Sequence, residues 1–153
     1  MTQRAERQIV PMTVENVHAA AEMLKVCFAA PWSESIYRRD LADPQSLALL
    51  CTEHGAVIGF IHCSYVLDEL TLNTLAVLPE YRRQGIARML WAEMRSRMQD
   101  ICAVCYLEVR EHNTAARRLY ESLGFVQNGF RPRYYSDPEE AAVLMEARLQ
   151  AAE

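Results

Sequence analysis

The sequence predicts a mixed α/β fold, α+β by some schemes, in which one central sheet of about six to seven strands is flanked by about four helices. Two observations support this prediction. Segments of helical period interleave with strand-like segments in the order β-α-α-β-β-β-α-β-α-β-β. The chain of 153 residues also contains no internal repeat, linker-like segment or long block of like charge. We therefore expect a single domain over residues 1–153.

The chain opens with a predicted strand and a predicted amphipathic helix. Residues 6–12, ERQIVPM, read as a short strand, and Thr13 follows as a candidate N-cap. Five apolar residues then recur at helical spacing, at Val14, Val17, Ala21, Leu24 and Phe28. One face of this helix should therefore pack against the sheet.

A second, short helix and three strands are predicted next. Ser33 is its candidate N-cap, and it should end near Asp43-Pro44, because the residue before a proline disfavours helical geometry. Three strand-like runs follow, at residues 46–52, 56–66 and 69–77. Residues 53–55, Glu-His-Gly, are typical of a tight hairpin turn between the first two.

The second half of the chain alternates between helix and strand. A helix begins at about Gly85, with one apolar face formed by Ile86, Leu90, Met94 and Met98. Residues 103–109 are almost continuously apolar, as in a strand covered on both faces. A helix over 113–123 should stop at Gly124, which accepts the left-handed conformation. The tail predicts strands near 125–131 and 141–149, separated by a polar loop through Tyr134, Tyr135 and Pro138.

Charge and composition exclude several classes of protein. The net charge of −4 argues against a protein that binds by neutralising nucleic-acid phosphates, so we expect no direct nucleic-acid partner. No apolar stretch approaches the roughly 20 residues that cross a bilayer, so no membrane partner is expected. The 5 cysteines follow no disulfide framework and the polar start MTQRAERQ lacks a secretory core. These features indicate a reducing, cytoplasmic location.

The most informative segment joins a strand to a helix through a basic loop. Leu75, Ala76 and Val77 end the strand, and Arg82-Arg83-Gln84-Gly85-Ile86-Ala87 leads into the helix. The first amides of a helix lack partners within the helix and lie at the positive end of its dipole, so the amides of residues 83–88 could bind a pyrophosphate. The glycine spacing fits neither a Walker loop nor a dinucleotide-binding fingerprint. An ordinary surface loop is the alternative.

Two sequence blocks resemble the GNAT acyltransferases. RRQGIA after LAVLPEY is similar to the Arg/Gln-x-x-Gly-x-Gly/Ala acetyl-CoA loop of that family, although Ala87 stands where glycine is common. LEVREHNTAARRLYESLGF resembles the family's strand, asparagine, and helix ending in Tyr-x-x-x-Gly-Phe. The similarity extends over most of residues 46–149. Pro31-Trp32-Ser33, the LEVR-x-x-N spacing and residues 131–135 look like the branch that acetylates ribosomal-protein alanine, the RimI type.

This resemblance implies acetyl-CoA as co-substrate, no metal, and direct attack by a protein N-terminal α-amine in a ternary complex. The implied acceptor is the N-terminal alanine of small-subunit ribosomal protein eighteen, and we expect a monomer or weak dimer. Asn113 is either only the N-cap of its helix or also a coenzyme contact. The expected coenzyme-binding residues, including backbone amides that stabilise the oxyanion, are Leu75, Ala76, Val77, Arg83, Gln84, Gly85, Ile86, Ala87, Arg88 and Asn113.

Glu108 is the candidate general base. It shares a strand face with Val104 and Tyr106, and a carboxylate at the end of an apolar strand should be partly desolvated, which makes it a better proton acceptor. The alternative is a carboxylate that faces water or pairs with Arg110. The resemblance places the family's catalytic glutamate at this position.

Tyr120 is the candidate general acid. It lies on the apolar stripe of its helix, so a core tyrosine is the alternative. The resemblance places here, twelve residues after the glutamate, the group that protonates the departing coenzyme sulfur.

The remaining reactive residue types carry weaker signals. Cys102 and Cys105 lie three residues apart, on opposite strand faces, so they are not expected to bind a metal. An acyl-cysteine at Cys105 or Cys63 would need an activating base that the sequence does not locate. His62, within an apolar strand, is expected to be structural.

Two other functions remain open at this stage. The same chemistry could acetylate a small amine such as a polyamine, or the chain could bind acyl-CoA without turnover. Trp32, Tyr134 and Tyr135 could line a peptide groove or serve only in packing.

Overall fold

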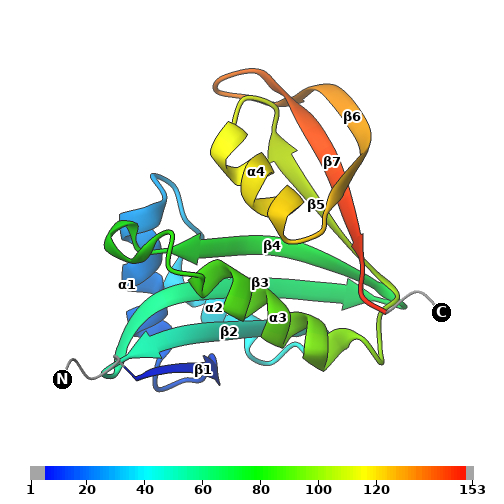
Figure 1. Ribbon diagram of the computed structural model, residues 1–153. Helices are drawn as coiled ribbons and strands as arrows, with labels where there is room; N and C mark the ends of the chain where they lie inside the picture. Colours follow the sequence, from blue (N-terminus) through cyan, green and yellow to red (C-terminus); the bar gives the residue numbers. More distant parts are fainter. Residues whose placement is uncertain (1–5, 151–153) are drawn as a thin grey trace. The chain divides into compact units, whose positions relative to one another are not determined.

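Seven strands and four α-helices follow one another in the predicted order in the computed structural model, which describes residues 6–150 (Figure 1). A 3-10 turn, Pro79–Tyr81, precedes α3. No helix within the described range is long and apolar enough to cross a membrane. The elements are β1 (Arg7–Pro11), α1 (Val17–Cys27), α2 (Glu34–Asp40), β2 (Ser46–Glu53), β3 (Ala56–Val66), β4 (Glu69–Val77), α3 (Ile86–Met98), β5 (Val104–Arg110), α4 (Thr114–Ser122), β6 (Val126–Tyr135) and β7 (Glu140–Arg148).

The strands form one mixed sheet in the order β1-β2-β3-β4-β5-β7-β6. β4 and β5 pair in parallel over Glu69–Thr71 and Val104–Tyr106. The pairs β1·β2, β2·β3, β5·β7 and β6·β7 are antiparallel. The predicted fold class, a mixed sheet flanked by four helices, is confirmed.

The chain divides into two compact units, and β4 contributes to both. The first contains the described residues up to Ser64 together with Asn73–Arg97, and the second contains Tyr65–Leu72 together with the residues from Met98 onward. Each unit is described separately below. The single domain expected over residues 1–153 stays a prediction.

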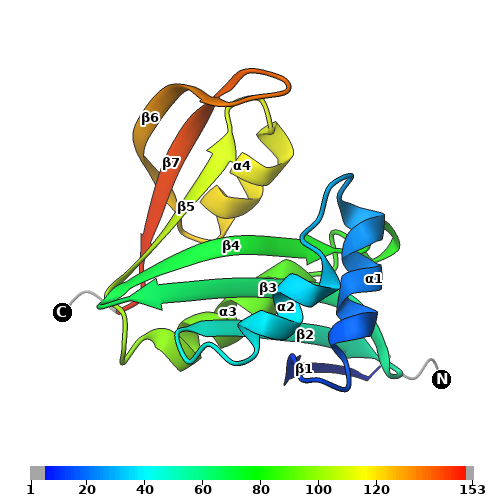
Figure 2. The same ribbon diagram turned by 180° about the vertical axis from the view of Figure 1, so that it is seen from behind.

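In the first unit, helices cover both faces of β2 and β3. Figures 1 and 2 show α1 and α2 on one face and α3 on the other. α3 packs directly on the backbone of β3, because a Cβ at Gly59 would lie 2.8 Å from Cγ2 of Ile86 and 3.1 Å from Cδ1 of Leu90. This close packing fixes the start of α3, and with it the loop that precedes the helix.

The helix starts show which of the predicted caps form. Ser33 caps α2 as predicted, since its Oγ accepts a hydrogen bond from the Ile36 amide. Thr13 does not cap α1, and that prediction is wrong. Instead, the Asn16 Oδ1 accepts from the Thr13 amide at 2.7 Å, which makes a turn, and α1 begins only at Val17. α2 also ends at Asp40, ahead of the predicted boundary.

In the sheet β5 lies between β4 and β7, and within the second unit α4 lies beside β5 (Figures 1 and 2). Gly124 ends α4 with φ +102°, as predicted. Burial alternates along β5, with Cys105, Leu107 and Val109 buried and their neighbours more exposed. The expectation of a strand covered on both faces is therefore wrong.

β6 extends beyond its predicted end near residue 131, whereas β7 has its predicted length. β6 continues through Tyr134 to Tyr135, so these tyrosines are not in the connecting loop, which covers only residues 136–139. β6 is an edge strand of the sheet, where a proline such as Pro132 is tolerated. The predicted loop position of both tyrosines is corrected accordingly.

Candidate active site

The loop before α3 belongs to the first unit and has a specific backbone shape. Arg83 and Gly85 both adopt positive φ, at 62° and 82°. The Arg82 Nε donates to the Val77 carbonyl at 3.0 Å, which ties the loop to the end of β4. The backbone angles of the loop and its hydrogen bond to the end of β4 therefore define its shape.

The start of α3 offers main-chain donors to an anion. The Met89 amide donates to the Gly85 carbonyl at 3.0 Å, so the amides of residues 86–88 lie in the first turn, at the positive end of the helix dipole. A Cβ added at Gly85 would meet no protein atom within 4 Å, so the space beside this glycine is open. A phosphate-bearing substrate fits a site of this kind.

The side chains of the loop have separate tasks. Gln84 accepts a hydrogen bond from the Arg7 guanidinium and donates to the Glu80 carbonyl at 3.3 Å, so it braces the loop. Ile86 is buried in the core, which leaves only its amide for a ligand. Arg83 and Arg88 have exposed side chains and Ala87 is half-buried.

The predicted oxyanion segment lies at the end of β4. Ala76 and Val77 are buried and Leu75 is half-buried. The Val77 carbonyl accepts from Arg82 and, at 3.6 Å, from the Cys27 thiol. The oxyanion role of the amides of residues 75–77 stays a prediction.

Replacing Gly85 with alanine should weaken coenzyme binding. A left-handed conformation costs a residue with a Cβ about 1–2 kcal/mol. The free loop escapes this strain by leaving φ +82°, and binding must restore it. Isothermal calorimetry should therefore show an acetyl-CoA Kd raised by roughly 5- to 30-fold.

The matched control for this variant is Gly55→Ala. Gly55 has φ +83° and equally open surroundings, but it lies in the β2–β3 turn. Gly55→Ala introduces the same left-handed strain away from the loop before α3, so only Gly85→Ala should lose affinity. If the two variants bind acetyl-CoA with equal affinity, Gly85 does not contribute to coenzyme binding.

Glu108 lies in the second unit, on β5, opposite Leu144 of β7. It shares its face with Val104 and Tyr106, as predicted, but its side chain is exposed, so the expected desolvation by the strand is absent. Its partner is Tyr134: a side-chain hydrogen bond to Glu108 raises the pKa of the Tyr134 hydroxyl. The alternative pairing with Arg110 does not form, because Arg110 pairs with Glu140 at 3.3 Å.

Asn113 and Tyr120 belong to α4 and its N-cap. The Asn113 Oδ1 accepts from the Ala116 amide at 3.2 Å, so the N-cap reading is confirmed, while a coenzyme contact stays a prediction. Tyr120 is half-buried, and its ring meets the edge of Phe125 at a centroid distance of 5.9 Å. This packing orients the ring, and the general-acid role stays a prediction.

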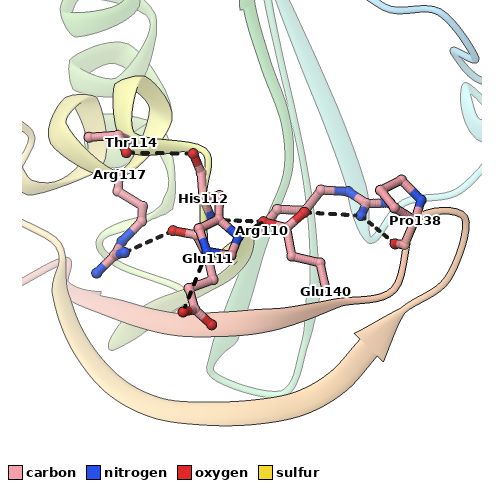
Figure 3. A network of polar contacts seen from close by, with 7 residues as sticks. All are labelled: Arg110, Glu111, His112, Thr114, Arg117, Pro138 and Glu140. Atoms are coloured by element: carbon pink, nitrogen blue, oxygen red, sulfur yellow. Dashed lines mark hydrogen bonds and ion pairs between the residues drawn. The ribbon is translucent and has the colours of Figure 1, made fainter.

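A polar network joins the end of β5 to the start of β7, and Figure 3 shows its members. The Glu140 carboxylate accepts from the His112 amide at 2.7 Å and from Arg110 at 3.3 Å. These contacts hold the pKa of Glu140 below its ordinary value. The hydrogen bond from the His112 amide has the largest effect, and the contact with Arg110 has a smaller one. The Arg117 guanidinium donates to the Glu111 carbonyl at 2.9 Å, so α4 is tied to the same loop.

The stability contributed by Glu140 should disappear in acid. A carboxylate whose pKa is lower in the folded than in the unfolded state stabilises the fold above the unfolded value, and loses this effect as the pH falls through the folded value. The stability difference between the wild type and Glu140→Gln, measured by urea unfolding, should therefore shrink from neutral pH to about pH 3.

Glu139→Gln is the control for this measurement. Glu139 pairs with Arg133 at the exposed surface of the same turn, where an ion pair contributes little. If the difference in stability between the wild type and Glu140→Gln stays constant with pH, the role given to Glu140 is wrong.

Sequence reasoning missed the contacts of Tyr134 and Arg110, because Tyr134 is placed by the β6–β7 pairing and Arg110 meets Glu140 through the β5–β7 pairing, both between segments far apart in the chain. His62 is structural as predicted: it is 2% exposed, and its Nε2 lies 2.7 Å from Asp40 and 2.8 Å from Ser46. All five cysteines are free thiols. Among residues 6–150, no group of three or more His, Cys, Asp or Glu side chains could hold a metal ion.

Comparisons with known proteins agree with this geometry. Residues 17–125 match the acetyltransferase (GNAT) family. The [ribosomal protein bS18]-alanine N-acetyltransferase of Escherichia coli K12 is 35% identical over 140 residues, which are 90% of this chain and 94% of that protein. A crystal structure of the Escherichia coli enzyme superposes with a TM-score of 0.85 at 33% identity, covering 97% of each chain. An Arabidopsis thaliana NAA60 structure in complex with acetyl-CoA shares the fold, with a TM-score of 0.83 at 18% identity over 94% of this chain and 98% of that one. This chain belongs to the GNAT family of acetyltransferases.

Proposed function

We propose that this protein transfers the acetyl group of acetyl-CoA to the N-terminal α-amine of a protein, with the N-terminal alanine of ribosomal protein bS18 as the first candidate acceptor. The observation that supports the acceptor is the 35% identity, over 90% of the chain, to an enzyme named for that substrate. We place the reaction in the cytoplasm, where free thiols stay reduced.

The coenzyme is assigned to the loop before α3. Main-chain amides of residues 83–88 bind its pyrophosphate, and the exposed Arg83 and Arg88 side chains add positive charge. Gln84 contributes indirectly, by holding the loop against Arg7 and Glu80. The amides of residues 75–77 are assigned to the thioester oxygen, where negative charge develops.

An α-amine is the easier nucleophile for this chemistry. Its pKa lies near 7.7–8.0, so roughly a third is neutral near pH 7.4, against about one in a thousand for a lysine side chain near 10.4. Glu108 accepts the proton that the amine loses as the C–N bond forms, directly or through water. Its exposed position on β5 leaves the carboxylate accessible to a protein terminus.

Tyr120 donates a proton to the coenzyme sulfur as the C–S bond breaks. An ordinary tyrosine titrates near 10 and a thiol near 8.5, so the transfer is uphill by roughly 2 kcal/mol and depends on positioning. The ring contact with Phe125 and the backbone bond from the Phe125 amide to the Tyr120 carbonyl, 3.0 Å long, fix this end of α4.

A competition between acceptors tests the proposal. Release of the coenzyme thiol is followed with peptides that begin with Ala, Ser or Met, with the same peptides blocked at the N-terminus, and with spermidine. Turnover should require a free peptide N-terminus. Faster turnover of spermidine would show that the acceptor is a small amine. Thiol release at a rate that does not depend on the acceptor would show that the protein only hydrolyses acetyl-CoA.

A further inference from the structure

The first strand of the sheet contacts the loop before α3 through Arg7. β1 is an edge strand, and it pairs with β2 so that Arg7 lies opposite Glu53. The Arg7 Nε donates to the Glu53 carboxylate at 3.4 Å, and the Arg7 Nη2 donates to the side-chain carbonyl of Gln84. All three residues belong to the first unit. Arg7 therefore joins the edge of the sheet to the loop that is assigned to the coenzyme.

The register of β1 places Arg7 on the face of the sheet that α3 covers. Glu53 and Cys51 are two residues apart in β2, so their side chains point to the same face. A Cβ at Gly59 would lie 3.3 Å from the Cβ of Cys51 and 2.8 Å from Cγ2 of Ile86, so α3 begins on this face. Residues opposite each other on paired strands share a face, so Arg7 points to the same side. The strand pairing thus brings the Arg7 guanidinium to the start of α3.

Gln84 is held at both ends of its side-chain amide. Its Oε1 accepts from Arg7, and its Nε2 donates to the Glu80 carbonyl at 3.3 Å. Its neighbours in the chain, Arg83 and Gly85, have positive φ, at 62° and 82°. The left-handed region is unfavourable for a residue with a Cβ such as Arg83, so other contacts must stabilise this shape of the loop. The brace from Arg7 through Gln84 to Glu80 supplies such contacts.

We propose that Arg7 is a positioning residue for the coenzyme: by holding Gln84, it keeps residues 83–85 in the conformation that presents the amides of residues 83–88 to the pyrophosphate. This inference rests on the proposed function, which assigns those amides to the coenzyme. A loop that already has its bound shape loses less conformational freedom when the ligand arrives, so it binds the ligand more tightly. Arg7 acts through Gln84, and not through a contact of its own with the phosphates.

The first test compares two arginine variants of the first unit. Arg7→Met removes the brace, whereas Arg97→Met removes an arginine that pairs with Glu93 one turn earlier in α3. Arg7→Met should raise the acetyl-CoA KM by roughly 5- to 20-fold, the effect of losing one net hydrogen bond. Its kcat at saturating acetyl-CoA should stay that of the wild type, because the occupied loop has the same shape in both proteins. Arg97→Met should keep both constants.

The second test asks whether Arg7 acts through Gln84. Gln84→Met removes the hydrogen-bond acceptor without changing any charge. This variant should raise the acetyl-CoA KM at least as much as Arg7→Met does, and Arg7→Met should add nothing in a protein that already carries Gln84→Met. A further rise in the double variant, or a wild-type KM in Gln84→Met, would overturn the proposal. If Arg7→Met fails to fold, Gln84→Met, which leaves the Arg7–Glu53 pair in place, makes the same test.

The third test uses ionic strength and needs no turnover. Salt weakens direct attraction between an arginine and a pyrophosphate, since the Debye length falls from about 10 Å at 0.1 M to about 3 Å at 1 M. A hydrogen-bonded brace inside the protein is much less sensitive to salt. The acetyl-CoA Kd of Arg7→Met, divided by that of the wild type, should therefore be the same in calorimetry at about 0.1 M and about 1 M salt. A ratio that falls toward one at high salt would show direct attraction and refute the brace.

The two possible failures are distinguishable. If the wild type does not bind acetyl-CoA, or binds it and transfers no acetyl group to peptides, the proposed function fails. If the wild type binds and transfers, but Arg7→Met has the same acetyl-CoA KM as Arg97→Met, the positioning role of Arg7 alone is wrong.

Discussion

Replacing Glu108 with glutamine should lower kcat for peptide acetylation by about a hundredfold to ten-thousandfold, the usual contribution of a positioned general base. Glutamine keeps an oxygen that can accept the Tyr134 hydrogen bond, but it cannot take the amine proton. The acetyl-CoA Kd, measured by calorimetry, should not change, because the role proposed for Glu108 is on the amine and not on the coenzyme.

Glu146→Gln is the matched control for this variant. Glu146 lies on β7 opposite Tyr106, so it occupies the neighbouring strand of the same unit. This variant should retain wild-type kcat. Full activity of Glu108→Gln across the pH range would exclude Glu108 as the base.

The second large loss is expected from Tyr120→Phe. Without the hydroxyl, the coenzyme must leave as an unprotonated thiolate, so kcat should fall by roughly 10²- to 10⁴-fold. The phenylalanine ring keeps the contact with Phe125, so the thermal unfolding midpoint should move little. The acetyl-CoA KM should also be retained.

Tyr106→Phe tests whether this loss is specific. Tyr106 is a half-buried tyrosine of β5, and burial raises the pKa of its hydroxyl. It has no assigned role, so its variant should turn over normally. If Tyr120→Phe and Tyr106→Phe behave alike, Tyr120 is a packing residue, the alternative that its place on the apolar stripe of α4 suggests.

Local sequence signals predicted the elements whose ends are set by neighbouring residues. Gly124 ends α4 because a left-handed residue is needed there, and Ser33 caps α2 through its own hydroxyl. The β2–β3 hairpin turns at His54 and Gly55, both with positive φ. Local preference did not decide the start of α1: Thr13 is a favoured capping residue, but the helix begins at Val17, after Asn16, whose side chain makes no cap hydrogen bond.

Contacts between segments far apart in the chain could not be predicted from the local sequence. Gly85 and its motif pointed to the loop before α3, but the brace from Arg7 to Gln84, which joins β1 to that loop, could not be expected from them. The partner of Glu108 was also hidden, because Tyr134 reaches it only through the β6–β7 pairing. Arg110, two residues from Glu108, was the obvious local candidate, yet it pairs with Glu140.

The most direct test is to locate the transferred acetyl group. A peptide that begins with alanine and contains one internal lysine is incubated with the protein and acetyl-CoA, and fragment masses are read by tandem mass spectrometry. We predict a single acetyl group on the alanine α-nitrogen and none on the lysine. A peptide acetylated only at lysine, or not at all, would contradict N-terminal acetyl transfer by this protein.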